Sequence, residues 1–311
     1  MKMIPSMMDR RMNAYLGTFF ILVLALSLLA IAPVSSIPDK IITKSLDPDE
    51  GGLGTVVTVT LTIEGTGDDE SVIVTDALKG TGFSYIPLSA SITPTSTKKG
   101  LIRFDLTEDA EITFEVKVTE AYAWDDMVIE NEANALWSDG TEDSATAEFT
   151  IKAFESLDKG VGDDLAHETN AILGENTEWT LHITADNPFG FIMEDAVIKD
   201  RFGAEIEIDG DYEAGVWYTD GATQGRWQYK TKGNSDKVFL TWEIGDLAIS
   251  GTATLTLEIS TDLNPAGHQE YTELGEEVLN SGATLKFIDP DQDMQLSAYT
   301  GSITVDVEEV S

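Results

Sequence analysis

Lysine, aspartate and asparagine recur in the same order in the two halves of this 311-residue chain. The two sets are Lys44, Asp76 and Asn131, then Lys159, Asp200 and Asn280. These residue types suit an intramolecular amide bond, in which a lysine amine attacks an asparagine side chain and expels ammonia. Apolar burial keeps the amine neutral and nucleophilic by lowering the lysine pKa. The same burial raises the pKa of a carboxyl group, so that it can polarise the amide. Both sets are therefore candidate crosslinks, with the aspartates as acids.

The same residues also have an ordinary interpretation. The lysines would lie at a sheet edge and the asparagines in turns. Asp76 directly follows the apolar run Val72-Ile-Val-Thr75, and aspartate commonly opens a turn after a strand. Contact inside a core would distinguish the two interpretations.

The segments that must position these residues alternate apolar and polar side chains with a period of two. Residues 57–63, 112–119, 179–184 and 253–259 follow this pattern. Successive side chains of a strand point to opposite faces, so each segment has one core face and one solvent face. Lys117 falls in the solvent phase. Turn residues such as Ser138-Asp-Gly140 separate the segments, and no stretch after residue 36 has clear helical periodicity. The pattern predicts an all-β chain of β-sandwiches.

The repeated order of motifs indicates two tandem domains. We place the first at residues 37–153 and the second at residues 154–311, each long enough for its own core. The link near Ala153 is short and has no proline or glycine before Gly160. We therefore expect a stiff rod rather than a flexible pair.

The motifs resemble those of a conserved repeat domain of archaeal and bacterial surface proteins, catalogued as domain of unknown function eleven. The matching residues are Lys44-Ser-Leu, Gly54-Thr55, Val72-Ile-Val-Thr-Asp76 and Asn131-Glu-Ala133, then Lys159, Gly174, Val197-Ile-Lys-Asp200 and Asn280-Ser-Gly282. An asparagine that often ends the family's first long strand matches Asn187, but Gly65 and Gly67 stand there in the first half. The resemblance implies immunoglobulin-like sandwiches used as extracellular stalk or lattice modules. Domains of similar shape in Gram-positive pilins and adhesins join a first-strand lysine to a last-strand asparagine.

The composition is strongly acidic and lacks cysteine. With 19 basic and 56 acidic residues, the formal net charge is −37, which repels nucleic acid and anionic lipid. Solubility or a salty habitat is one explanation of this charge, and cation binding is another. Without cysteine the chain has no disulfides and no thiolate zinc site, so stability must come from the cores, bound ions or other crosslinks.

The N-terminus, residues 1–36, has the features of a signal peptide. A basic start at residues 2–11 precedes an apolar run at residues 16–34, and Ser35-Ser36 offers small residues for cleavage. We expect a mature chain that begins near Ile37. The alternative is an uncleaved N-terminal anchor, because the run is nearly long enough to span a bilayer. Both alternatives place the protein outside the cell or at its surface.

Two further groups are candidate binding residues. Asp289, Asp291 and Asp293 space three carboxylates two apart, and Ca²⁺ prefers such oxygen ligands. The run is not an EF-hand, and a solvated acidic loop is the other interpretation. An insertion in the second domain gathers four aromatic residues that would stack on sugar rings if exposed, or pack into a core. They are Trp217, Tyr218, Trp227 and Tyr229.

The sequence contains no recognisable enzyme motif. Its three histidines are far apart, and neither Gly-x-Ser-x-Gly nor a phosphate loop occurs. We expect a secreted, non-enzymatic structural module of a surface layer, stalk or filament. Its partners would be other surface proteins or copies of itself, with no nucleic acid, and with membrane contact only through an uncleaved N-terminus. The alternatives are a binding or adhesion protein that uses the aromatic insertion, and a secreted hydrolase.

Overall fold

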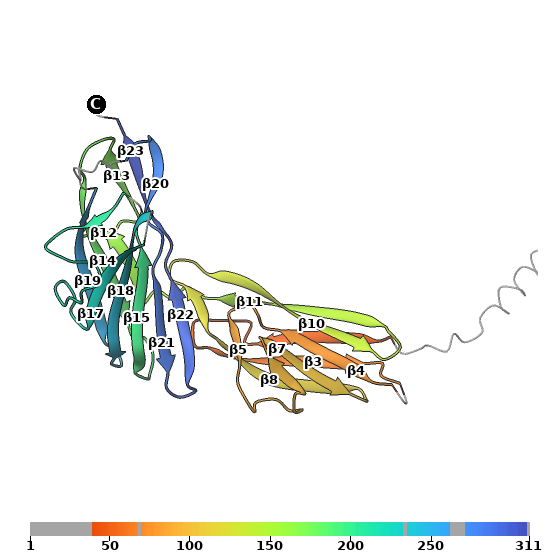
Figure 1. Ribbon diagram of the computed structural model, residues 1–311. Coiled ribbons are helices and arrows are strands. Elements are labelled where there is room, and N and C mark those ends of the chain that lie inside the picture. Colours follow the sequence, from red (N-terminus) through yellow and green to blue (C-terminus); the bar gives the residue numbers. More distant parts are fainter. Residues whose placement is uncertain (1–38, 68–69, 204, 233–234, 262–270, 310–311) are drawn as a thin grey trace, which may run out of the picture.

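The computed structural model describes residues 39–67, 70–203, 205–232, 235–261 and 271–309. These residues form strands and turns, which confirms the all-β prediction (Figure 1). Within these ranges there is no helix of the length and apolarity that a membrane crossing requires. The predicted signal peptide or anchor lies outside the described residues.

The first domain consists of two sheets packed face to face. Its strands are β1 (Ile41–Asp47), β2 (Glu50–Gly51), β3 (Val56–Glu64), β4 (Val72–Ala77), β5 (Phe83–Tyr85), β6 (Ser96–Lys98), β7 (Leu101–Leu106), β8 (Ala110–Val118), β9 (Glu120–Tyr122), β10 (Met127–Trp137) and β11 (Glu142–Ile151). One sheet has the order β1-β3-β8-β5 and the other the order β2-β11-β10-β4-β7-β6. Phe83 of β5 packs edge-on against Phe149 of β11, with ring centroids 5.1 Å apart, so the core lies between the sheets.

The second domain repeats this arrangement. Its strands are β12 (Leu157–Val161), β13 (Glu168–Ile172), β14 (Glu178–Asp186), β15 (Met193–Arg201), β16 (Glu207–Ile208), β17 (Arg226–Lys232), β18 (Ser235–Leu247), β19 (Thr252–Ser260), β20 (Gly275–Asn280), β21 (Thr284–Asp289), β22 (Met294–Tyr299) and β23 (Ile303–Glu308). The sheet β12-β14-β19-β16 corresponds to β1-β3-β8-β5. The facing layer is divided into β13-β23-β20 and β17-β18-β15-β21-β22-β9.

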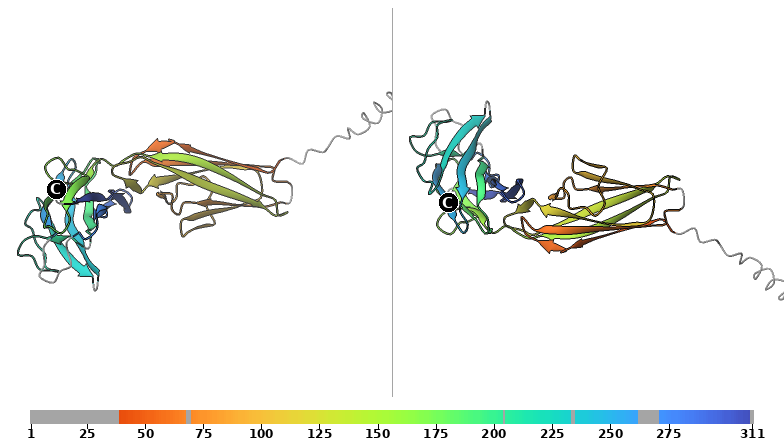
Figure 2. Two further views of the ribbon diagram at one scale, coloured as in Figure 1. Left: turned by 90° about the horizontal axis from the view of Figure 1, so that it is seen from above. Right: turned by 90° about the horizontal axis from the view of Figure 1, so that it is seen from below.

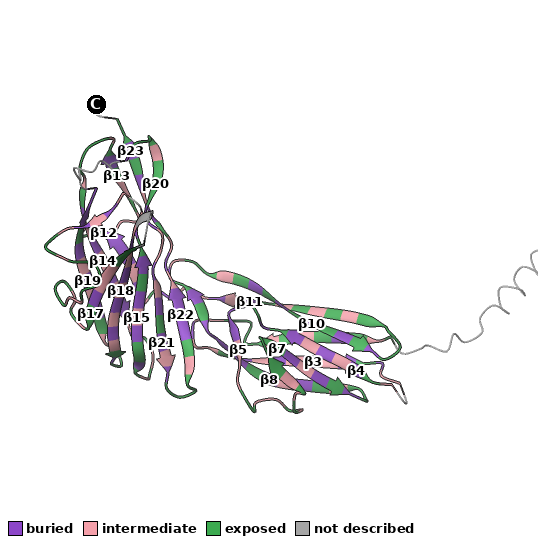
Figure 3. Ribbon diagram, in the orientation of Figure 1, coloured by how far each residue is buried: buried purple, intermediate pink, exposed green. Residues whose placement is uncertain are grey.

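The alternating sequence pattern sets the burial of both domains (Figure 3). In β3 the apolar side chains of Val57, Val59, Leu61 and Ile63 are buried, while the threonines between them are not. In β19 Ala253, Leu255 and Leu257 are buried in the same way. Each strand thus contributes one face to a core, as its period of two requires.

One structural difference separates the two copies. In the first domain β10 and β11 are long, unbroken strands. The equivalent strands of the second domain are interrupted, β20 and β21 by residues 281–283 and β22 and β23 by residues 300–302. Gly282, at the first interruption, has a φ of +106°, a conformation that favours glycine.

The two domains contact each other through a paired strand and stacked side chains. Strand β9, which belongs to the first domain by sequence, pairs in parallel with β22 and so extends a sheet of the second domain. Trp124 stacks on His167 with ring centroids 3.8 Å apart. We expected a rod, but the domains meet at a bend (Figures 1 and 2). The pairing of β9 with β22 fixes this bend through backbone hydrogen bonds.

Candidate functional site

The two predicted crosslinking sets lie inside the two cores. Lys44, Asp76 and Asn131 come from β1, β4 and β10, and therefore from both sheets of the first domain. Each residue occupies the core-facing phase of its strand. Lys44 lies in phase with the buried Ile42, Asp76 continues the buried phase of Val74, and the neighbours of Asn131 in phase are buried. Strand geometry therefore directs all three polar side chains inward.

Asp76 bridges the other two residues of the first set. Its Oδ2 accepts a hydrogen bond from Lys44 Nζ, and its Oδ1 accepts one from Asn131 Nδ2 at 2.9 Å. Asn131 Nδ2 also donates to the carbonyl oxygen of Ala77 at 3.0 Å. The side chains of Lys44 and Asp76 are both 0% exposed. One carboxyl group thus lies within reach of the amine and of the amide.

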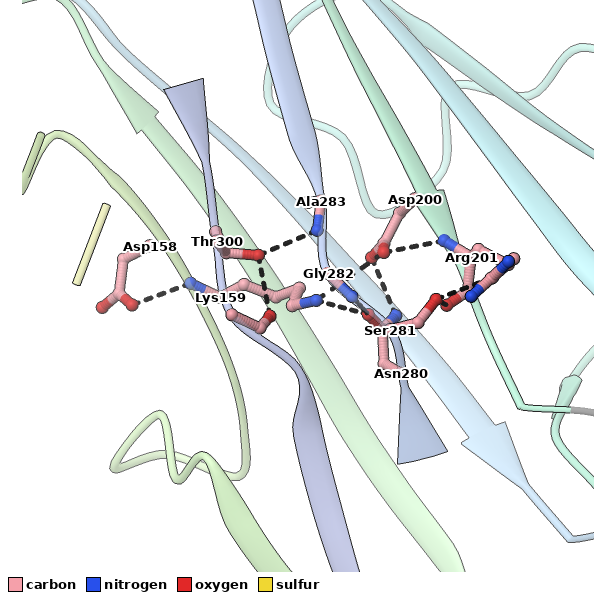
Figure 4. A network of polar contacts seen from close by, with 10 residues as sticks. Asp158, Lys159, Asp200, Arg201, Asn280, Ser281, Gly282, Ala283 and Thr300 are labelled. Carbon is pink, nitrogen blue, oxygen red and sulfur yellow. Dashed lines mark hydrogen bonds and ion pairs between the residues drawn. The ribbon is translucent and has the colours of Figure 1, made fainter. Parts of the chain in front are cut away.

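The second set has an equivalent arrangement, with a closer approach of amine to amide (Figure 4). Lys159 Nζ donates directly to Asn280 Oδ1 and lies 3.6 Å from Asp200 Oδ1. Asn280 Nδ2 donates to Asp200 Oδ2 at 2.8 Å. Lys159 comes from β12, Asp200 from β15 and Asn280 from β20. This set also joins opposite layers, and its lysine and aspartate side chains are 0% exposed.

Burial favours the neutral forms that the chemistry needs. Loss of solvent lowers the pKa of Lys44 and raises the pKa of Asp76, although their mutual attraction opposes both shifts. Burial also lowers the pKa of Lys159, against the attraction of Asp200. In the first set, a neutral amine beside a protonated carboxyl group is therefore more accessible than in water. Such a pair provides a nucleophile and a proton donor next to an amide carbonyl.

The three calcium candidates do not converge on one point. Asp289 is buried and pairs with Lys117 of the first domain, while Asp291 and Asp293 are exposed. Asp289 Oδ1 also accepts a hydrogen bond from the backbone N–H of Asp291 at 3.0 Å. Both oxygens of Asp289 therefore have protein partners. No group of three carboxylate or histidine side chains suited to a metal ion occurs in the described ranges.

The aromatic insertion packs largely upon itself. Trp227 is buried, and its ring lies 4.9 Å from that of Tyr212 and 5.3 Å from that of Tyr218. Its indole N–H donates to the carbonyl oxygen of Asp220. Tyr229 is half-buried, and its hydroxyl donates to the carbonyl oxygen of Tyr212.

Trp217 lies apart from this packing. It is half-buried, and Arg226 stacks over its ring with Cζ 4.4 Å from the ring centroid. The four aromatic residues therefore do not form one exposed stacking face.

Sequence reasoning missed one buried residue. Lys117 occupies the solvent phase of β8, but its side chain is only 7% exposed, because the second domain covers this end of the strand. The expectation that Lys117 faces solvent was wrong for that reason. A lysine near the end of an alternating strand, close to a domain boundary, was the available signal.

The comparisons with known proteins assign no family to this chain. No family model matches the chain, and no curated protein matches it either, so the resemblance to domain of unknown function eleven stays a prediction. Among solved structures, a red sea bream transglutaminase is similar to this chain at 12% sequence identity and a TM-score of 0.32. The match covers 88% of this chain and 32% of the transglutaminase chain. This chain therefore spans about a third of that protein.

Two bacterial structures show similarly weak likeness. The type II cohesin dyad from the ScaA scaffoldin of Acetivibrio cellulolyticus is 11% identical, with coverage of 87% and 97% of the two chains and a TM-score of 0.24. BcpA, the major pilin subunit of Bacillus cereus, is 10% identical, with a TM-score of 0.30. The match covers 87% of this chain and 69% of the BcpA chain.

Proposed function

We propose that this chain is an extracellular structural module whose two β-domains crosslink themselves through amide bonds from Lys44 to Asn131 and from Lys159 to Asn280. The observation that carries the proposal is the buried aspartate that contacts both the lysine and the asparagine in each core. A solvated edge lysine and a turn asparagine, the ordinary interpretation, would not meet in this way.

The proposed reaction needs only the three side chains. The lone pair of lysine Nζ attacks asparagine Cγ, and the bond from Cγ to Nδ2 breaks. The aspartate carboxyl group carries one proton from Nζ to the departing Nδ2, so that ammonia leaves and a secondary amide remains. Each aspartate presents one oxygen to the amine and the other to Nδ2, which suits this transfer. The acid is regenerated, and no oxidant or cofactor is consumed.

The proposed bonds suit a load-bearing role. Each would join the first strand of a domain to a late strand of the facing layer, and so would hold the two layers together covalently. Each closes a loop of roughly 100 residues, for which the chain-entropy model gives a stabilisation of about 4–5 kcal/mol. A chain without cysteine has no disulfide to serve this purpose.

The remaining features agree with a location outside the cell. The basic and apolar N-terminus resembles a secretion signal, and the net charge of −37 suits a solvated external surface. Partners would be other surface proteins or further copies of the chain in a layer, stalk or filament. We do not extend the proposal to a carbohydrate site, because Trp227 lies in the core.

Cell fractionation tests the location of the protein, and mass spectrometry of the denatured chain tests the amide bonds. The proposal expects the protein in the external fraction, with an N-terminus near Ile37 or an intact anchor. Recovery only from the cytoplasm would contradict the extracellular role. A denatured chain of full calculated mass would contradict the crosslinks.

A further inference from the structure

The strand interruption after Asn280 gives the second set a contact that the first set lacks. The backbone N–H of Gly282 donates to Asn280 Oδ1 at 3.0 Å (Figure 4). In the first domain β10 continues without a break through Asn131, and Asn131 Oδ1 is a buried oxygen with no hydrogen-bond partner among the described residues. The two asparagine carbonyl groups therefore lie in different electrostatic surroundings.

This difference concerns the atom on which charge develops. When lysine Nζ adds to Cγ, the carbonyl electrons move onto Oδ1 and form an oxyanion, which collapses as Nδ2 leaves as ammonia. A fixed backbone N–H directed at that oxygen stabilises the developing charge. We infer that the Gly282 amide is an oxyanion donor for the Lys159–Asn280 crosslink, and that the second domain therefore crosslinks faster than the first. This inference rests on the proposed function.

Neighbouring contacts hold the donor in place before reaction. Residue 283 donates through its backbone N–H to Thr300 Oγ1 at 2.8 Å, and Thr300 N–H donates back to the carbonyl oxygen of Ala283 at 3.0 Å. A Cβ atom at Gly282 would lie only 2.8 Å from the carbonyl oxygen of Thr300. Glycine is thus required both by φ and by close packing. A donor fixed in this way needs little reorganisation during reaction.

The expected effect is large enough to measure. Removal of one such donor slows acyl-transfer enzymes by about 10²–10³-fold. With otherwise comparable sets, we expect the Lys159–Asn280 bond to form on the order of 10²-fold faster than the Lys44–Asn131 bond. Direct contact of Lys159 with the asparagine oxygen acts in the same direction.

A pulse of cell-free synthesis measures both bonds in the same molecules. The full chain is quenched in denaturant at intervals and digested, and the two crosslinked peptides are quantified by mass spectrometry. The expected result is early appearance of the Lys159–Asn280 peptide and late appearance of the Lys44–Asn131 peptide. Equal rates, or a faster first-domain bond, would overturn the inference while leaving the proposed function intact. Absence of both peptides would overturn both.

A substitution at Gly282 tests the backbone donor, because a Cβ atom at this positive φ would displace the N–H from Asn280 Oδ1. Gly282→Ala should slow the second-domain bond by at least about tenfold relative to the first-domain bond, which serves as an internal clock. Gly215→Ala is the matched control, because Gly215 also has a positive φ, of +83°, but has open space around a Cβ atom. An unchanged ratio in a folded Gly282→Ala chain would contradict the role. If that chain does not fold, equal rates or a faster first-domain bond in the wild type would still overturn the inference.

Discussion

Lys117 of the first domain and Asp289 of the second form a buried ion pair across the domain junction, with side chains only 7% and 1% exposed. The two residues lie 172 positions apart in the sequence. Together with the pairing of β9 and β22, this contact joins two repeated sandwiches into one bent body. The proposed structural role requires such a fixed connection between the domains.

Breaking this ion pair should destabilise the chain. Asp289→Asn leaves the Lys117 charge buried without its partner, and such a loss costs about 3–5 kcal/mol of unfolding free energy. Thermal denaturation should show a clearly lower Tm. Lys152→Met is the control, because Lys152 makes an exposed pair with Glu50 and should change Tm little. An Asp289→Asn chain with wild-type Tm would show that the junction does not depend on the pair.

The double variant Lys117→Met with Asp289→Leu separates the two contributions to this effect. Apolar replacement of both partners removes the stranded charge, and is often neutral or stabilising in buried sites. We therefore expect most of the lost Tm to return. A double variant as unstable as Asp289→Asn would mean that packing, rather than the unpaired charge, accounts for the loss.

Removal of the first-domain acid should prevent the first-domain bond alone. Asp76→Asn keeps the size of the side chain but cannot deliver a proton, so the chain should retain one ammonia more than the wild type. The first domain should lose about 4–5 kcal/mol of stability, the value expected for opening the closed loop. Asp105→Asn on the neighbouring strand is exposed and should affect neither mass loss nor stability. Mass loss that persists in Asp76→Asn would exclude Asp76 as the acid.

The rate of bond formation should vary little with pH near neutrality. Burial lowers the pKa of Lys44 and raises that of Asp76, so both shifts favour the neutral pair over the ion pair. The two forms contain the same number of protons and interconvert without exchange with solvent. Freshly synthesised chain that is still uncrosslinked, transferred to buffers between about pH 6 and about pH 8, should form the bond at similar rates. A rise of roughly tenfold per pH unit would instead indicate a solvent-exposed amine with an ordinary lysine pKa.

Calcium should raise Tm only modestly, through weak binding to many carboxylates of the folded surface. The comparison is between calcium chloride and sodium chloride at matched ionic strength. The Asp291→Asn variant should respond like the wild type, because Asp289 is engaged by Lys117 and the three aspartates do not converge. Loss of the calcium response in Asp291→Asn would restore the Asp289 loop as a specific site.

Local periodicity was sufficient to predict much of the fold and part of the site. The alternation in β3 and β19 predicts their core faces, and Lys44 and Asp76 lie in phase with apolar neighbours on their strands. Which strands face each other is a tertiary property, so contact within each set required the structure. The burial of Lys117 depends on a second domain that its own strand does not encode.

The hydrogen bond from Gly282 to Asn280 also could not be predicted from the local sequence pattern. Asn280-Ser-Gly282 and Asn131-Glu-Ala133 look like variants of one motif, yet only the first interrupts its strand and directs an N–H at the asparagine oxygen. A bulge between Val278 and Asn280 shifts the register there, so strict alternation fails at this position. The hydrogen bonds between Ala283 and Thr300 that accompany this irregular backbone are tertiary contacts, which periodicity does not encode.

The most direct test of the account is the intact mass of the denatured mature chain. We predict a mass lower than the calculated value by two ammonia molecules, with fragments that assign one loss to Lys44–Asn131 and the other to Lys159–Asn280. A chain of full calculated mass, or a mass loss that maps to other residues, would contradict the central claim.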